Sequence, residues 1–272
     1  MSLARNSSRL LKLTGFQPKR LLRNLKRLPG YLHDYRTIRA QSQKSSADFA
    51  LSDLFPILDE SAKPAGSACG HYFHQDLHVA RLIRQRNPTR HIDVGSRVDG
   101  FVAHVAAFRD IEVVDVRSLT STTPGITFLC ADLMQELPPQ LENATDSLSC
   151  LHVIEHFGLG RYGDPVDFEG HIKGLANLRR MLKPGGTLYL STPISNRQRI
   201  EFNAHRVFSV PYLLSLLESD FALESFAYVG DDGQLRTPVD VTDAGMNDTW
   251  GLNYGCGIFE LKDRRNCSAK AA

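Results

Sequence analysis

The chain lacks long hydrophobic runs. No stretch approaches the ~18 consecutive apolar residues that a membrane-spanning helix needs, and the start has no short apolar segment followed by a small-residue cleavage site. Cysteine is scarce as well, because the 272 residues contain only five, and none of them forms a Cys-x-x-Cys pair. An odd, scattered set predicts reduced thiols and indicates neither a disulfide framework nor a bound metal. We therefore expect a cytoplasmic protein that is not inserted in a membrane.

Acidic residues are nearly absent from the first 40 positions. Of the 32 basic and 30 acidic residues in the chain, ten basic residues and one acidic residue, Asp34, lie in residues 1–40. This segment therefore carries a charge of +9 and the rest of the chain carries −7. We expect no nucleic-acid binding by the acidic part, whereas the basic part suits a polyanionic surface.

The basic segment contains leucines at helical spacing with lysines and arginines between them. Leu21, Leu22, Leu25 and Leu28 predict one apolar face of a helix that ends at Pro29-Gly30. Such a helix suits an anionic membrane surface, where each cation contributes about 1 kcal/mol, and would place the protein peripherally at the inner face of the membrane. Two alternatives stay open: a helix packed on the main domain, and an organellar transit peptide.

Residues 90–115 predict a strand, a glycine turn, a helix and a second strand. The first strand, residues 90–94, runs into Gly95-Ser96, a helix follows over residues 101–108, and the second strand ends at Asp115. The 22 residues from Asp93 to Asp115 are close to the ~20 that separate a glycine turn from a ribose-binding acid in nucleotide-binding βαβ units. The spacing predicts an adenosine-type ligand at the strand ends.

This stretch resembles the first two motifs of class I S-adenosylmethionine (SAM) dependent methyltransferases, Asp-x-Gly-x-Gly and the acid that closes the second strand. The resemblance implies cofactor binding by Asp93, Gly95, Ser96, Arg97 and Asp115. Arg97 occupies the position of the family's second glycine, where it either narrows the methionine slot or binds the cofactor's carboxylate. The alternative for the motif is a turn that only packs a helix.

Two further strands end in residues to which the resemblance assigns roles. The strand at residues 126–130 precedes Asp132-Leu133, which would contact the adenine, although an Asp in this place is commonly a helix cap. The strand at residues 146–151 leads into His152-Val-Ile-Glu-His156, which resembles a methyltransferase signature and implies a cofactor contact for His152. The same spacing matches an inverted zinc-protease motif, but a histidine at a strand end breaks the required one-face geometry.

Polar loops after the fourth and fifth strands predict an acceptor site. Residues 158–165 hold three glycines around Arg161 and Tyr162, which favours a lid over a plain surface loop. Residues 197–206 supply Arg199, Asn203, His205 and Arg206 to the same cleft. His156 and His205 are the candidate bases that would deprotonate an acceptor hydroxyl.

Residues 70–76, Gly-His-Tyr-Phe-His-Gln-Asp, precede an expected helix of about ten residues that ends at Gln85. Residues just ahead of the first strand commonly cover the cofactor in the resembled family, which favours such a role for His71 or Tyr72. The alternative is N-capping by Asp76 and packing by Tyr72. A zinc site at His71, His74 and His78 is disfavoured because Asp76 is the only other nearby ligand.

The rest of the chain completes an α/β fold. A helix over residues 172–182, a Lys-Pro-Gly-Gly turn and a strand at 187–191 are followed by a helix at 212–217 capped by Ser209, and then by an antiparallel pair at 223–229 and 257–261. We expect a Rossmann-like, mostly parallel, seven-stranded sheet with an antiparallel last strand. The expected divisions are a basic helical extension with its linker (1–69), a methyltransferase domain (70–262) and a tail (263–272).

Four segments, residues 70–76, 154–164, 201–209 and 253–260, resemble more narrowly an uncharacterised bacterial subfamily of methyltransferase-like proteins. The implied function is transfer of the SAM methyl group to an oxygen of a small polar acceptor, such as a sugar of a glycan precursor. The residues expected to hold that acceptor are Arg161, Tyr162, Arg199, Asn203 and Arg206. The alternative is a non-catalytic module that docks to a membrane or partner through the basic helix.

Overall fold

The computed structural model describes residues 17–47, 49–58, 60, 64–241 and 244–265. The chain divides into two units, residues 1–67 and residues 68–272. Cys267 and the first three basic positions of the extension lie outside the described residues.

The N-terminal unit contains the helix α2, Pro18–Ser42, which is 25 residues long. The expectation that this helix ends at Pro29-Gly30 is wrong, because α2 continues through Pro29. A proline inside a helix removes one backbone hydrogen bond, but the leucines, lysines and arginines around it are good helix formers. No helix among the described residues is long and apolar enough to cross a membrane.

The second unit is built on one mixed sheet of eight strands in the order β3-β2-β1-β4-β5-β10-β8-β9. The first five strands in this order, β3 to β5, are parallel to one another, and β10 is antiparallel to both β5 and β8. The strands are β1 His91–Val94, β2 Ile111–Asp115, β3 Ile126–Cys130, β4 Thr145–Leu151, β5 Leu182–Ile194, β8 Phe221–Val229, β9 Leu235–Arg236 and β10 Gly255–Asp263. The α/β class, the mostly parallel sheet and the antiparallel last strand are confirmed. The expected count of seven strands is wrong, because the two-residue β9 adds an eighth at the edge.

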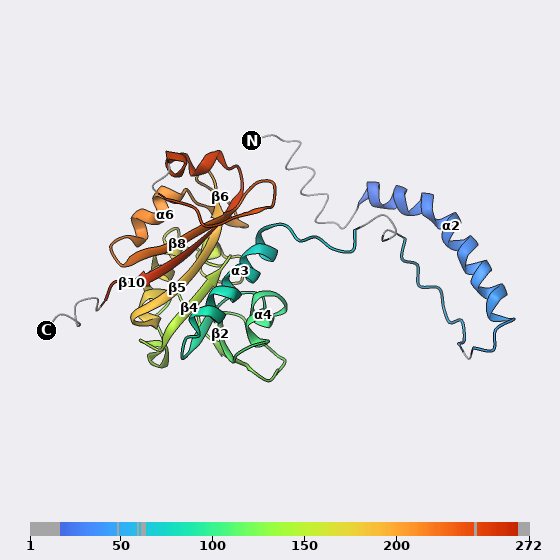
Figure 1. The fold of residues 1–272 in the computed structure, drawn as a ribbon, viewed down its shortest axis with the longest axis horizontal. Helices are drawn as coiled ribbons and strands as arrows, with labels where there is room; N and C mark the ends of the chain where they lie inside the picture. The colour runs from blue at the N-terminus through green and yellow to red at the C-terminus, as the bar shows by residue number, and fades with distance from the viewer. Residues whose placement is uncertain (1–16, 48, 59, 61–63, 242–243, 266–272) are drawn as a thin grey trace. The chain divides into compact units, whose positions relative to one another are not determined.

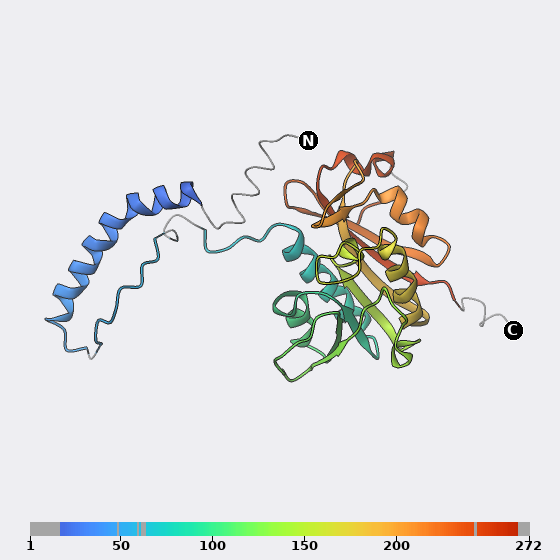
Figure 2. The ribbon, with the colours of Figure 1, turned by 180° about the vertical axis from the view of Figure 1, so that it is seen from behind.

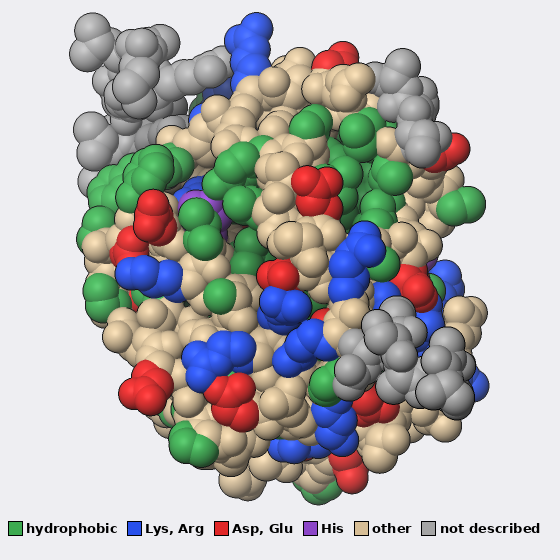
Figure 3. All heavy atoms as spheres, turned by 90° about the vertical axis from the view of Figure 1, so that its left-hand side faces the viewer, with side chains coloured by type: hydrophobic (Ala, Val, Ile, Leu, Met, Phe, Trp, Pro, Cys, Tyr) green, Lys and Arg blue, Asp and Glu red, His purple; other side chains and the backbone are tan. Residues whose placement is uncertain are grey.

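Helices cover both faces of the sheet, as Figures 1 and 2 show from opposite sides. The helices are α3 His71–Arg86, η1 Val98–Val102, α4 Ala103–Ala106, η2 Pro139–Leu141, η3 Ile154–His156, α5 Gly170–Met181, α6 Val210–Leu217 and η4 Ala244–Gly251. A separate hairpin, β6 Arg199–Glu201 with β7 His205–Val207, follows β5. The face of the molecule in Figure 3 carries interspersed acidic and basic side chains, with no large area of one sign.

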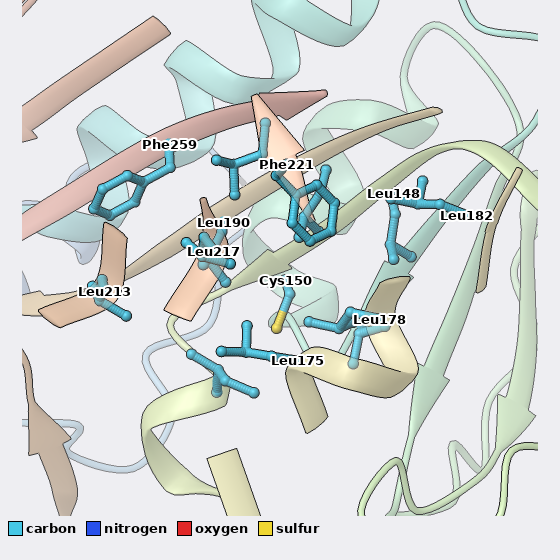
Figure 4. Packing of buried hydrophobic residues seen from close by; sticks show 14 of the residues in the cluster. Leu148, Cys150, Leu175, Leu178, Leu182, Leu190, Leu213, Leu217, Phe221 and Phe259 are labelled. Atoms are coloured by element: carbon cyan, nitrogen blue, oxygen red, sulfur yellow. The ribbon is translucent and has the colours of Figure 1, made fainter. Parts of the chain in front are cut away.

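The alternation of side chains along the strands produces a core on each face. On one face, Leu148 and Leu190 pack with Leu178 of α5 and Leu213 of α6 (Figure 4). On the other face, buried residues of α3, η1 and α4 pack against side chains of the strands, among them Leu151, Tyr189 and Ile258. Both faces are buried, so the ligand-accessible edge is left at the carboxyl ends of the parallel strands.

The N-terminal ends of α6 and α3 test two helix caps expected from the sequence. Ser209 caps α6 as expected, because its Oγ accepts a hydrogen bond from the Tyr212 backbone N–H at 3.4 Å. Helix α3 starts earlier than expected, at His71, directly after Gly70, whose φ is 90°. Asp76 therefore lies buried within the helix, and N-capping by Asp76 is wrong.

Candidate functional site

Two adjoining cavities open at the carboxyl ends of the parallel strands. The strand-end cavity has a volume of about 70 Å³ and is lined by the ends of β1, β2 and β3, including Gly95, Asp115, Asp132, Leu133 and Met134. The histidine cavity has a volume of about 440 Å³, and its lining includes Tyr72, Ser96, Arg97, Arg161, His205 and Tyr254. Both linings include Gly95, Arg117, His152, His156 and Tyr162. The cavities therefore meet along one shared wall.

The turn after β1 is held by the buried carboxylate of Asp93. Ser96 donates to it from its backbone N–H at 3.0 Å and from its Oγ at 2.8 Å, and the Ser149 Oγ donates at 2.5 Å. Burial raises the pKa of Asp93 to about 7, against the lowering effect of these hydrogen bonds. Gly95 has a φ of 70°, and a Cβ there would lie 2.7 Å from Val153 Cγ1. The turn thus needs glycine for its conformation and for its close approach to the loop after β4.

Asp115, at the end of β2, lies in the strand-end cavity beside Arg117. The guanidinium of Arg117 donates to both carboxylate oxygens, at 3.0 and 2.7 Å, and its backbone N–H donates at 2.8 Å. The same guanidinium lies 4.5 Å from the centroid of the Tyr162 ring, a cation–π distance. Arg117 therefore links the end of β2 to the glycine-rich loop after β4.

Asp132 and Leu133 line the strand-end cavity from the loop after β3. Asp132 accepts a hydrogen bond from the Met134 backbone N–H at 2.9 Å, and Leu133 is buried. This turn leaves the Asp132 carboxylate at the cavity wall while Leu133 and Met134 supply apolar surface. The lining suits a flat aromatic ring with polar edges.

His152 is held in a left-handed backbone conformation, with a φ of 56°, which favours glycine over other residues. Its Nδ1 lies 2.8 Å from Glu155 Oε1, and both residues are buried. Burial alone would lower the pKa of His152, but the neighbouring Cys256 and Glu155 outweigh it and raise the pKa. The His152 ring stacks on His71, with centroids 5.3 Å apart, and lies 5.1 Å from the ring of Tyr72.

His156 and His205 lie together, as expected, with ring centroids 6.4 Å apart. The Nδ1 of His156 donates to the Ala204 carbonyl oxygen at 2.7 Å, and Arg161 Nη1 donates to the same oxygen at 2.9 Å. Because Nδ1 carries the proton, Nε2 holds the free lone pair. Burial lowers the pKa of both histidines, so both rings are neutral at pH 7.

Three residues predicted to bind an acceptor lie outside the linings of both cavities. Arg206 is buried, and its guanidinium donates to the Phe157, Asp167 and Phe168 carbonyl oxygens. Arg199 pairs with Glu201 at 3.0 Å, and Asn203 is an exposed residue of the hairpin turn. The structure therefore brings Arg161, Tyr162, His156 and His205 to the lining of the histidine cavity, and it does not bring Arg199, Asn203 or Arg206 there.

Several cavity residues were not selected from the sequence. Arg117 follows the expected ribose acid by two positions, and Glu155 lies between the two histidines of the signature, so both were within reach of the motif argument. Gln75 and Tyr254 lie in residues 70–76 and 253–260, two of the segments that carry the resemblance, but the sequence assigned no role to either residue. Arg97 lines the histidine cavity while its guanidinium pairs with Asp99 at 2.8 Å, and 63% of its side chain is exposed.

Comparison with known proteins gives one family match over part of the chain. The model of a family described as "Caenorhabditis protein of unknown function, DUF268" matches residues 129–244. This segment runs from the end of β3 past β9 and includes Arg161, Tyr162 and His205 of the histidine cavity. The description names Caenorhabditis, not bacteria, and no curated protein matches the chain.

Solved structures resemble the chain over about two thirds of its length. The 1,6-didemethyltoxoflavin-N1-methyltransferase of Burkholderia thailandensis, solved with 1,6-didemethyltoxoflavin and S-adenosylhomocysteine, has a TM-score of 0.50 at 15% identity and covers 70% of this chain and 78% of its own. The [4+2]-cyclase SpnF has a TM-score of 0.47 at 16% identity and covers 68% and 80%. The N-methyltransferase NodS of Bradyrhizobium japonicum, solved with S-adenosylhomocysteine, has a TM-score of 0.46 at 12% identity and covers 71% and 88%. The first of these matches identifies the Rossmann-like methyltransferase fold in this chain.

Proposed function

We propose that this protein binds SAM in the strand-end cavity and transfers its methyl group to an oxygen of a small polar acceptor in the histidine cavity. The observation that carries the proposal is the wall shared by the two cavities, formed by Gly95, Arg117, His152, His156 and Tyr162. Methyl transfer needs the nucleophile and the sulfonium carbon in line and about 3 Å apart. Two adjoining cavities that share lining residues support such an arrangement.

The cofactor's parts match the groups around the strand-end cavity. Asp115 would accept from the two ribose hydroxyls, and Asp132 with Leu133 would contact the adenine. The methionine end would pass Gly95 and Ser96, where Asp93 holds the turn, and would reach Arg97 and His152 in the histidine cavity. The Arg97 guanidinium suits the cofactor's carboxylate, which supports carboxylate binding by this residue.

His156 is the better placed of the two candidate bases. Its lone pair is held on Nε2 because Nδ1 donates to Ala204. His156 also lines both cavities, whereas His205 lines only the histidine cavity. In the reaction, Nε2 takes the hydroxyl proton, the acceptor oxygen forms a bond to the methyl carbon, and the carbon–sulfur bond breaks with its electron pair left on sulfur. The products are the methyl ether, S-adenosylhomocysteine and a protonated histidine that releases its proton to water.

Arg161 and Tyr162 would hold the acceptor from the glycine-rich loop. Tyr162 is 37% exposed and packs edge-on against the His156 ring, with centroids 5.6 Å apart. The polar lining of the histidine cavity suits a polyhydroxylated acceptor, such as a sugar of a glycan precursor. We place the reaction in the cytoplasm of the cell, and the likeness of the chain to a bacterial methyltransferase-like subfamily is part of this proposal.

Binding of the cofactor alone tests the first half of the proposal. Calorimetry of the full chain with SAM and with S-adenosylhomocysteine should detect one site for each ligand, and no binding at millimolar ligand would overturn the proposal. A methyl-transfer assay with SAM labelled on its methyl group and a panel of sugars and sugar phosphates then tests the second half. Label transferred only to amines would overturn the oxygen acceptor and leave the cofactor site standing.

A second candidate function is docking at an anionic membrane surface. It is favoured by the apolar residues of α2, because none of them is buried: Leu21, Leu22 and Leu25 are 53%, 58% and 56% exposed. Seven basic residues of α2 surround this apolar face: Lys19, Arg20, Arg23, Lys26, Arg27, Arg36 and Arg39. A helix of this kind binds anionic lipid through its leucines and its cations together.

A further inference from the structure

Three possible metal ligands from distant parts of the sequence converge at His152, which lines the histidine cavity, although His71 and Cys256 do not line it. The ligand atoms of His71, His152 and Cys256 all lie within 4.8 Å of one another. His71 is in the first turn of α3, His152 directly follows β4, and Cys256 is the second residue of β10. Because β10 is antiparallel to β5, its start lies beside the carboxyl end of β5, which is where the cavity opens.

The geometry of His152 leaves one nitrogen directed away from its partner. Glu155 Oε1 lies 2.8 Å from Nδ1 and keeps a proton there, so Nε2 is the nitrogen that would bind an ion once it has given up its own proton. That Nε2 is buried and has no hydrogen-bond partner among the described residues. A buried polar atom without a partner costs about 1–3 kcal/mol, and a ligand that binds to it would remove this cost.

We propose that His71, His152 and Cys256 bind one zinc ion, with a fourth position open to the histidine cavity. Two imidazoles and a thiolate are the ligand types that zinc selects, and three protein ligands with one open position are typical of a catalytic zinc. The carboxylate of Glu155 on the far nitrogen of His152 reproduces the carboxylate–histidine–zinc arrangement that orients ligating histidines. Magnesium and calcium are disfavoured because they prefer oxygen ligands.

To bind one zinc ion, the ligand atoms of His71, His152 and Cys256 must move closer together. Zinc bonds of about 2.0–2.1 Å to nitrogen and about 2.3 Å to sulfur place tetrahedral ligand atoms roughly 3.3–3.6 Å apart, against the 4.8 Å limit observed here. His71 is the ligand with room to move, because it is only partly buried at the start of α3. Its ring lies between those of His152 and Tyr254, with centroids 5.3 Å from each.

Binding the ion displaces a proton from Nε2 of His152 and the thiol proton of Cys256. The Cys256 Sγ now makes weak contacts, at 3.7 Å, with Gln75 Oε1 and with the carbonyl oxygen of Gly257. It would bind zinc as the thiolate and release its proton to water. The open position would be filled by water, or by a hydroxyl of the acceptor that the proposed function places in this cavity. The proposed metal site does not depend on that function. Of its three ligands, only His152 lines the strand-end cavity, in which the cofactor is proposed to bind.

The experiment uses the full chain, stripped with a chelator and then reloaded with zinc alone or with cobalt(II) alone. One zinc per chain should bind, and cobalt(II) should give visible bands of tetrahedral coordination together with a near-ultraviolet sulfur-to-cobalt band. Cys256→Ser should abolish the sulfur band, His71→Ala should weaken zinc binding at least 100-fold, and Glu155→Gln should weaken it about 10- to 100-fold. His104→Ala and Cys130→Ser are the matched controls, because both residues are exposed and lie outside the cluster.

Each outcome decides the proposal. Cobalt(II) loading without a sulfur band, or zinc affinity equal in the wild-type protein and the Cys256→Ser and His71→Ala variants, overturns it. A variant that fails to fold is recognised by its circular dichroism, and His71→Ala, at a partly exposed helix start, then carries the test. Calorimetric binding of SAM is measured on the same stripped protein, so loss of cofactor binding and loss of metal binding are seen separately.

Discussion

The guanidinium of Arg117 lies 4.5 Å from the centroid of the Tyr162 ring while it also donates to both carboxylate oxygens of Asp115. One side chain thus joins the expected ribose acid at the end of β2 to the glycine-rich loop after β4. A ribose that enters the strand-end cavity shares the Asp115 carboxylate with Arg117. Under the proposed function, cofactor binding would therefore be coupled to the position of the loop through Arg117.

Replacing Asp115 with Ala should weaken SAM binding about 10- to 100-fold. The ribose hydroxyls lose a charged acceptor, and such hydrogen bonds contribute about 1.5–3 kcal/mol. Glu112→Ala is the matched control, since Glu112 is on the same strand but pairs with Arg90 at 2.6 Å and lies outside both linings. Calorimetry on both variants checks this prediction, and equal dissociation constants in the two would remove Asp115 from the cofactor site.

Replacing His156 with Ala should lower turnover about 10²- to 10⁴-fold, the usual contribution of a general base, and leave SAM affinity unchanged. His205→Ala should have a smaller effect, because His205 lines only the histidine cavity whereas His156 lines both cavities. Steady-state kinetics with an identified acceptor provides the measurement. If His156→Ala retains wild-type turnover, base catalysis by this residue is excluded.

The dependence of turnover on pH also tests whether His156 is the general base. Burial lowers the pKa of His156 below 6.5; Glu155 and the Ala204 carbonyl oppose this effect, and Arg161 and His205 add to it. The neutral base is present above its pKa, so turnover should be flat near pH 7 and should fall only at pH values below 6.5. An acidic limb centred above pH 7 would contradict the assignment.

The free energy of unfolding should decrease as pH rises from 5 to 7 because of Asp93. Its pKa is about 7 in the folded chain against 3.8 for the free side chain, so the folded state holds a proton that the unfolded state has lost. The stability that protonated Asp93 contributes is fully present below pH 3.8 and is lost as pH rises through 7. Over this range the free energy of unfolding falls by at most about 1.4 kcal/mol per pH unit.

Urea unfolding at several pH values measures that slope. Asp93→Asn should flatten it, whereas Asp99→Asn should not, because Arg97 lowers the pKa of Asp99 and this exposed carboxyl is ionised in both states over the window. Identical slopes for the wild-type protein and Asp93→Asn would show that Asp93 is ionised in the folded chain at pH 5.

Gly95→Ala should destabilise the protein by about 2–4 kcal/mol. Its positive φ costs an L-residue about 1–2 kcal/mol, and the contact of the new Cβ with Val153 adds about 1–2 kcal/mol of overpacking. Gly185→Ala separates the two terms, because Gly185 has nearly the same φ, 71°, with no atom within 4 Å of the added Cβ. Chemical unfolding should show that Gly185→Ala lowers the free energy of unfolding only by the cost of the positive φ. Equal decreases for both variants would mean that the Val153 side chain moves away from the added Cβ at no cost.

Deleting residues 1–40 should reduce cosedimentation with anionic liposomes and leave SAM affinity intact. The deleted segment carries +9 of charge and the exposed leucines of α2, and added salt should weaken binding of the full chain in the same direction. Equal cosedimentation of the two proteins would reject the membrane-surface role. Full-length protein with Leu21, Leu22 and Leu25 changed to Ser separates the apolar contribution from that of the charge.

The sequence by itself determined the succession of the five parallel strands and the antiparallel pair, and with it the edge where Gly95, Asp115 and Asp132 lie. Each of these residues follows or ends an apolar strand, and parallel strands present their carboxyl ends on one side. The cap of α6 by Ser209 was equally local, because capping depends on residues three positions apart. Such features need only the nearest neighbours along the chain.

The tertiary structure alone decided which polar side chains reach the cavities. Arg206 and His205 are adjacent in the sequence, yet Arg206 is buried against three backbone carbonyls while His205 lines the histidine cavity. His71 and Cys256, far apart in the chain, meet only because α3 packs beside a strand that runs against its neighbours. The physical reason is that periodicity reports which face of an element is buried, whereas the partner of a polar atom depends on long-range packing that no local pattern encodes.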